Sequence, residues 1–466
     1  MIASPNNSTA EKTRSTDAGL LDQSALSDLA QRLVEAARRA GADAADAVAV
    51  RGVSQGVEVR DGRVEESERS EGDDVGLRVL VGKRQAVVST NDVGGDGIAK
   101  LAERAVAMAR VAPDDDYVGL ADPALLAREF PNLDLLDPSM PSTAELERRA
   151  LEAEAAGIAV KGVTKSGGAS ASSGIGGMVL VTSTGFHGAY LRSSQGISMT
   201  AISGTGTGME RDYDFSSALH GADLDSPESI GRSAGARAVA RANPRKAETC
   251  KAPVIFDPRV AGSLVGHLVG AANGASIARK TSFLKDRLGQ RLFANGIRII
   301  DDPRRVRGLR SQSFDAEGVA TKQLAIIDDG VLTSWLLDSA TARELGMTTT
   351  GHAHRGVSSS PMPGAYNLHM EAGEMTPAEL MADIKQGFYV TDLIGSGVNG
   401  VTGDYSRGAS GFWIENGKPT YAVSEMTIAG HLFDIFKSLR PANDLEFRYG
   451  VNAPTLRIEG LTIAGR

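Results

Sequence analysis

Hydrophobic spacing in the N-terminal part of the chain changes from helical to strand-like and back. Apolar residues recur at helical spacing over 26–37 and again over 95–111. Between these segments the period falls to two, and Asp61-Gly62 and Gly82 mark two tight hairpin turns. This order predicts a layer made of a helix, an antiparallel meander and a second helix.

The central part of the chain predicts another helix followed by a long polar sheet. Ser142 or Thr143 caps the helix. Residues 162–210 are dominated by Ser, Thr, Gly and β-branched residues, with a turn at Gly185, which indicates long antiparallel strands with one polar face. A short Ala-rich helix is expected over 226–242, before an Asn-Pro pair.

The C-terminal half begins with a strand at 253–256 and a helix from about 258 to 272. Helical spacing returns near 377–387 and 427–439. Strand-like segments are expected at 297–301, 323–337, 364–371, 388–392, 411–415, 419–427 and 454–463. The prediction is therefore an α+β fold whose C-terminal domain is rich in strands.

The length of 466 residues exceeds what one ordinary core supports, so we expect several domains. We divide the chain into a disordered tail at 1–20, an N-terminal α+β domain at 21–140, a central helix plus antiparallel sheet segment at 141–245, and a β-rich C-terminal domain at 246–466.

Charge and composition exclude several kinds of partner. The net charge of −8 argues against a nucleic-acid partner, which would require a concentrated basic surface. No apolar run approaches the ~18 residues of a membrane span, and the N-terminus lacks the apolar core of a signal peptide. The single cysteine, Cys250, fits a reducing compartment. We therefore expect a cytoplasmic protein without a membrane partner.

The seven histidines are the first candidates for catalytic or metal-binding chemistry, because imidazole changes its charge near neutral pH. No His-Glu-x-x-His motif is present. His352 and His354 could face the same way, but no carboxylate lies between 348 and 355, so a loop held by histidine–backbone hydrogen bonds is the preferred interpretation. Cys250 has no histidine close in sequence and is not expected to be a nucleophile.

The most informative segment is the helix at 258–272. It has the shape of a His-Glu-x-x-x-His helix in which Gly262 and Ser263 replace the first His and the Glu, while His267 remains. With this helix, the chain resembles the TldD/PmbA family of metallopeptidases, in its PmbA (TldE) branch. The resemblance covers nearly everything after residue 20, and its most specific runs are 261–270, 300–303, 314–318, 367–373 and 401–413.

The resemblance implies that zinc belongs elsewhere. In the TldD branch, zinc is held by both histidines of the motif and a cysteine near the C-terminus, and the Glu is the general base. Here Gly262 and Ser263 occupy the first-ligand and base positions, and no cysteine lies between 431 and 466. We therefore expect no catalytic residue and no metal in this chain, with zinc in a partner chain. His267 is then a packing histidine.

The spacing of that motif also makes a geometric prediction. Positions five apart differ by ~140° on a regular helix and would not converge on one metal. A helix that inherited such a site therefore needs a bulge or an early end, and Gly266 is where we expect it.

The resemblance implies a heteromeric peptidase in which this chain pairs with a TldD-type catalytic chain. Its peptide substrates would be short or unfolded, such as leader peptides or an antitoxin, and the Ser/Thr/Gly-rich strands suit peptide addition to a sheet edge. Two alternatives stay open. One is a non-enzymatic peptide-binding or regulatory protein, in line with the family's older label as a gyrase modulator. The other is a stand-alone metallopeptidase that combines His267 with His352 or His354; a homodimer is also open when the chain is alone.

Overall fold

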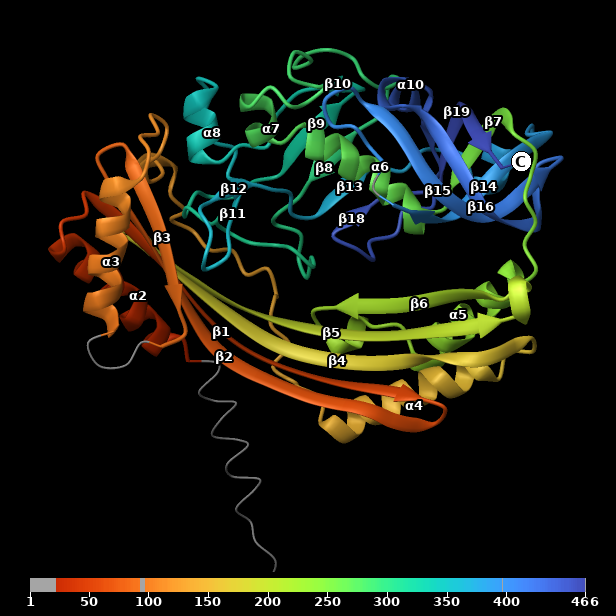
Figure 1. Cartoon of the computed structure of the whole chain (residues 1–466), viewed down its shortest axis with the longest axis horizontal. Helices are drawn as coiled ribbons and strands as arrows, with labels where there is room; N and C mark the ends of the chain where they lie inside the picture. The colour runs from red at the N-terminus through yellow and green to blue at the C-terminus, as the bar shows by residue number, and fades with distance from the viewer. Residues whose placement is uncertain (1–21, 93–96, 396, 466) are drawn as a thin grey trace, which may run out of the picture.

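The computed structural model describes residues 22–92, 97–395 and 397–465, so the tail predicted at 1–20 lies outside the described residues. The fold is mixed α+β, which confirms the predicted class. A long curved sheet carries helices on its outer face, and a second lobe rich in strands lies over its inner face (Figure 1). No helix in the described ranges is long and apolar enough to cross a membrane.

The first lobe is built on one antiparallel sheet of six strands in the order β3-β2-β1-β4-β5-β6. Its strands are β1 (Ala44–Arg60), β2 (Arg63–Val81), β3 (Arg84–Thr90), β4 (Val163–Thr182), β5 (His187–Ser203) and β6 (Glu210–Ala218). The predicted turn between β1 and β2 is present, with positive φ at Asp61 and Gly62. Because β1 pairs with both β2 and β4, the segments that the sequence divides at residue 140 share one sheet.

In the part of the chain that the structure describes, four helices cover the outer face of this sheet. They are α2 (Ser24–Arg39), α3 (Gly97–Val111), α4 (Thr143–Ile158) and α5 (Pro227–Arg241). Odd-numbered residues of β1 such as Ala47 and Val57 pack under them, while Val48 faces the second lobe. Of the two caps considered for α4, Ser142 is the one used: its hydroxyl accepts a hydrogen bond from the Glu145 amide at 3.2 Å.

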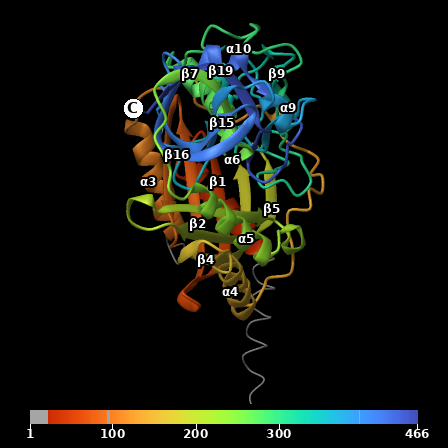
Figure 2. The ribbon, with the colours of Figure 1, turned by 90° about the vertical axis from the view of Figure 1, so that its right-hand side faces the viewer.

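The second lobe is a closed barrel with a smaller sheet and short helices. The barrel strands run β16-β15-β14-β7-β19-β17, and pairing of β16 with β19 closes the ring (Figure 2). They are β7 (Cys250–Phe256), β14 (Gln386–Ile394), β15 (Asp404–Glu415), β16 (Lys418–His431), β17 (Arg440–Pro441) and β19 (Leu456–Ala464). The smaller sheet comprises β8 (Ile299–Asp301), β9 (Leu324–Asp328), β10 (Val331–Leu332), β13 (Leu368–Met370) and β18 (Val451–Asn452), and β11 (Ala353–His354) pairs with β12 (Met362–Pro363).

Helices of the second lobe pack around and between these sheets. They are α6 (Pro258–Ala271), α7 (Gly274–Ala278), α8 (Ser339–Glu344), α9 (Pro377–Met381) and α10 (Leu432–Ser438). Two predicted helices are shorter than expected, because 427–431 belongs to the strand that closes the barrel and β14 takes over from residue 386. The expected strand at 323–337 is two short strands around a turn with positive φ at Asp329 and Gly330.

A buried ionic cluster joins the two lobes. Asp46 of β1 is 1% exposed and accepts a hydrogen bond from Nε of Arg78 at 2.8 Å and another from Arg355 of the second lobe. Burial pushes the pKa of Asp46 upward, but the charges of Arg355 and Arg78 hold it below its usual value. The carboxylate is thus a charged link between the lobes.

Candidate functional site

Helix α6 lies at the centre of the second lobe and carries the three motif positions. It begins at the Asp257 cap, which accepts a hydrogen bond from the Arg259 amide at 3.0 Å, and runs without interruption to Ala271. The prediction of a bulge or an early helix end at Gly266 is therefore wrong. The apolar face of the helix, including Leu264 and Leu268, is buried in the main core and holds it regular. Gly262 and His267 consequently point to different sides of the helix.

Position 262 has no room for a side chain. The backbone of β18 crosses α6 there, and a Cβ on Gly262 would lie 2.9 Å from the carbonyl oxygen of Val451. Ser263 is turned back onto its own helix, where its hydroxyl donates a hydrogen bond of 2.6 Å to the Val260 carbonyl. The first-ligand position, Gly262, is thus packed against backbone, and the side chain at the base position, Ser263, is engaged in a hydrogen bond within its own helix.

A pair of alanine substitutions tests this packing. Gly262→Ala is expected to lower the free energy of unfolding by about 1–3 kcal/mol, because backbone must move to admit the methyl group. Gly266→Ala, the matched control on the same helix, meets nothing within 4 Å and should raise it by about 0.5–1 kcal/mol. Urea unfolding measures both. A shift in the same direction for the two variants would contradict the close approach of β18.

His267 lies on the half-exposed side of α6 beside strand β15. Its ring meets the Tyr405 ring edge-on, with centroids 6.0 Å apart, and its Nε2 is buried without a hydrogen-bond partner among the described residues. Burial, with a further contribution from the charge of Arg407, lowers the pKa of His267 to about 4. The imidazole is therefore neutral at physiological pH.

These residues do not fit a zinc ion. A catalytic zinc takes three protein ligands and a water, and the motif positions offer one imidazole nitrogen. The neighbouring Arg407 guanidinium also repels a cation. Throughout the described part of the chain, no three His, Cys, Asp or Glu residues are gathered so that they could hold a metal.

The other sequence candidates lie apart from His267. Both His352 and His354 pack on the ring of Tyr366, at centroid distances of 5.4 and 4.4 Å. Nδ1 of His352 is 2.8 Å from the Thr350 carbonyl, as expected for a loop held by a histidine–backbone hydrogen bond. Cys250 starts β7 and packs against the main core, where burial raises the pKa of its thiol. None of these groups joins His267 in a shared site.

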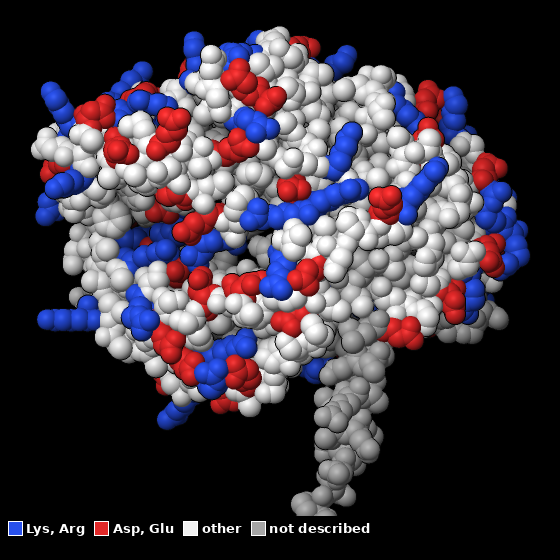
Figure 3. Space-filling model, turned by 180° about the vertical axis from the view of Figure 1, so that it is seen from behind, with Lys and Arg blue, Asp and Glu red and all other residues white. Residues whose placement is uncertain are grey.

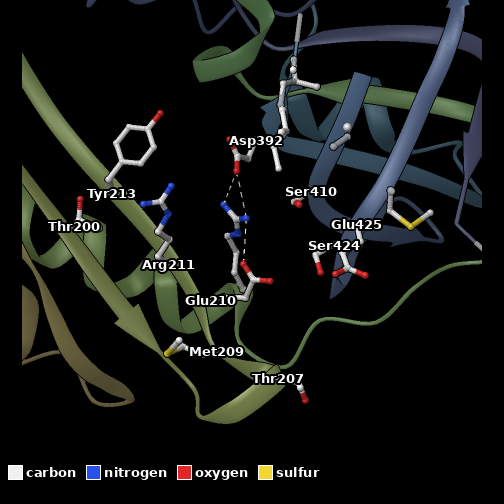
Figure 4. A pocket seen from close by; sticks show the side chains of 17 residues that line it. Thr200, Thr207, Met209, Glu210, Arg211, Tyr213, Asp392, Ser410, Ser424 and Glu425 are labelled. Carbon is white, nitrogen blue, oxygen red and sulfur yellow. Dashed lines mark hydrogen bonds and ion pairs between the residues drawn. The ribbon is translucent and has the colours of Figure 1, made fainter. Parts of the chain in front are cut away.

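Sequence reasoning missed a groove of about 870 Å³ between the lobes. Its walls are the start of β6 on one side and β14, β15 and β16 on the other (Figure 4). From behind, the surface is hollowed where the lobes meet, and basic side chains lie in the hollow (Figure 3). Arg241 of α5 spans it, with ion pairs to Glu210 at 3.3 Å and to Asp392 at 3.4 Å. An arginine at the end of an Ala-rich helix was the only sequence signal.

Comparison with known proteins covers most of the chain. Family models match in three parts: PmbA/TldA metallopeptidase domain 1 at 45–109, the central domain at 136–242 and the C-terminal domain at 249–465. The chain is 38% identical to Metalloprotease PmbA of Escherichia coli O157:H7 over 88% of its own length and 90% of that relative. The chain belongs to the PmbA/TldD metallopeptidase family. It is also 36% identical to a PmbA homologue of Haemophilus influenzae, over 93% and 94% of the two chains.

Solved structures share this fold. A Bacteroides thetaiotaomicron protein superimposes with a TM-score of 0.87 at 26% identity, over 94% of this chain and 98% of that one. TldE from Thermococcus kodakarensis superimposes with a TM-score of 0.83 at 19% identity, over 94% and 100% of the two chains, and shows a shared fold. In this member of the PmbA/TldD family, the runs 261–270 and 401–413 meet where His267 contacts Tyr405.

Proposed function

We propose that this chain is the PmbA/TldE-like, non-catalytic subunit of a heteromeric TldD-type zinc metalloprotease. The observation that carries the proposal is the closure of position 262 by the backbone of β18. A first zinc ligand cannot be placed there without moving that strand, and Ser263 supplies no base. The zinc then belongs to the TldD-type partner, a class of chain related to this one: a TldD homologue of Haemophilus influenzae is 28% identical over 231 residues.

The groove between the lobes supports a role in holding peptide. Strand β6 is the last strand of its sheet, and the start of this edge strand faces the groove. An extended chain can pair with such an edge through main-chain hydrogen bonds, which need no particular sequence. The substrates we propose are short or unfolded peptides, including leader peptides and an antitoxin, cleaved in the cytoplasm.

Association with the partner is the direct test of this role. We expect this chain and a TldD-type chain, co-expressed and passed over a size-exclusion column, to elute together ahead of either chain alone. A permanent complex of this kind buries more than ~2,000 Å². The control is each chain expressed singly and mixed afterwards, which separates weak contact from a stable assembly. Separate elution in both preparations would remove the heteromer from consideration.

A non-enzymatic, peptide-binding or regulatory role is the second candidate. The same groove favours it, because a peptide can lie between the lobes without a metal. This role is the better explanation if this chain and the TldD-type chain do not associate while this chain still binds extended peptides.

A further inference from the structure

Three polar side chains converge beside α6 outside the groove. Tyr405 and Arg407 lie two residues apart on β15 and therefore project from the same face of the strand, the face on which Tyr405 meets the His267 ring. Tyr405 is 1% exposed, and Arg407 and His267 are half-buried. An imidazole, a phenol and a guanidinium are thus brought together by one strand and one helix.

All three groups lack a partner within the described residues. Nε2 of His267, the hydroxyl of Tyr405 and Nε of Arg407 are each buried without a hydrogen bond. Nearly all buried polar atoms in folded proteins have a hydrogen-bond partner in the protein, in water or in a ligand. Three unpaired atoms in one place therefore indicate a binding partner that is absent from the structure.

Arg407 differs from three other arginines of this lobe whose side chains are largely buried. Arg259, Arg355 and Arg457 each form an ion pair with an aspartate. Within the described ranges, no carboxylate lies within ion-pair distance of the Arg407 guanidinium, and its buried Nε has no hydrogen-bond partner. Its charge is therefore uncompensated inside the protein, and the ligand that fits it is an anion.

The surface beside the cluster is open to a ligand. Gly266 precedes His267, and Gly270 lies one turn further along the same side of α6. A Cβ on either glycine would meet nothing within 4 Å, whereas one on Gly262 would meet backbone. The two glycines therefore leave space for a small group on the side of α6 next to His267.

We propose that His267, Tyr405 and Arg407 form a carboxylate-binding site. The guanidinium supplies the charge and a planar pair of donors that matches a carboxylate. Burial raises the pKa of Tyr405, so its hydroxyl keeps its proton and donates. Neutral His267 donates through Nε2–H. One uncompensated positive charge balances a carboxylate, whereas a doubly charged phosphate would keep an excess negative charge.

The carboxylate has two sources with the same chemistry, the C-terminus of a peptide or an Asp or Glu side chain within it. The choice of a peptide as the carrier rests on the proposed function. The site itself needs only this chain, so it is tested without any partner, and a failure of association does not affect the result.

Calorimetry with matched peptides tests the site on the full chain alone. The probes are an N-acetylated alanine pentapeptide with a free C-terminus, the same peptide as its C-terminal amide, and an amide with one internal Glu. We expect a carboxylate-bearing probe to bind at least about tenfold more tightly than the neutral amide, as a charge-assisted hydrogen bond implies. Whichever carboxylate probe binds more tightly identifies the source.

Variants assign that preference to the cluster. Arg407→Gln should abolish the difference between acid and amide, and Tyr405→Phe, which keeps the buried ring, should reduce it several-fold. Arg440→Gln removes the same charge from an exposed arginine of the barrel and should leave it unchanged. Equal binding of acid and amide by the unmodified chain, no binding of any probe, or a preference that survives Arg407→Gln would overturn the proposal.

Discussion

Asp46→Ala is expected to lower the free energy of unfolding by about 3–5 kcal/mol. The substitution removes the carboxylate that two buried cations share, Arg78 from the same sheet and Arg355 from the other lobe. Arg355 loses the one carboxylate partner it has among the described residues, and its Nε and one terminal nitrogen are already without hydrogen bonds. An unpaired buried charge is far more costly than the loss of a surface contact.

Chemical denaturation measures this effect, with Asp116→Ala as the control. Asp116 pairs with Lys83 of the same lobe, but both side chains are about two-thirds exposed, so its removal should cost less than ~1 kcal/mol. Similar losses for the two variants would show that the Asp46 cluster does not join the lobes. A loss confined to Asp46→Ala would show that the buried cluster of Asp46, Arg78 and Arg355 stabilises the protein.

Local features of the fold were predictable from sequence because their causes are local. The Asp61-Gly62 turn needs residues that tolerate positive φ, and both have it. Ser142 caps α4 through a hydrogen bond three residues away. The abundance of Ser, Thr, Gly and β-branched residues over 162–210 also predicted the long strands β4 and β5, which are joined by the Gly185 turn.

What sequence could not supply depends on contacts between distant segments. The space for a side chain at position 262 is occupied by the backbone of Val451 in β18, far along the chain. No sequence pattern around residue 262 predicts this contact. The absence of a bulge at Gly266 follows from burial of the apolar face of α6 in the barrel lobe. Residues 427–431 have helical spacing but form part of strand β16, because β16 pairs there with the distant strand β19.

The candidate site was also predictable only where its features are local in the sequence. The motif comparison located Gly262, Ser263 and His267 on one helix, which the structure contains. It could not show that Arg407 of another family run lies beside His267, since that requires the position of β15 against α6. The groove was missed because its two walls come from different lobes.

Peptidase activity is expected only when this chain and a TldD-type chain are present together, with each chain alone at background. The motif positions of this chain offer one zinc ligand and no base, so under the proposed function we expect the lone chain not to activate water. Under the same proposal, this chain supplies half of the peptide-binding surface, and we expect the TldD-type chain alone to lack that half. Cleavage of an unfolded peptide by each preparation measures the effect, and full activity of the TldD-type chain alone would contradict it.

His267→Ala in the assembled complex separates a metal ligand from a binding residue. Turnover at saturating peptide should stay within about tenfold of the unmodified complex, since His267 holds no metal in this account. A larger loss of turnover would place His267 in the chemistry.

The location of the zinc tests the central claim most directly. Elemental analysis of the metal-replete chain alone should find far less than one zinc per chain, and the co-purified complex should contain about one zinc per pair, unchanged by His267→Ala. About one zinc per chain in the lone protein, lost on His267→Ala, would show that this chain builds a metal site of its own.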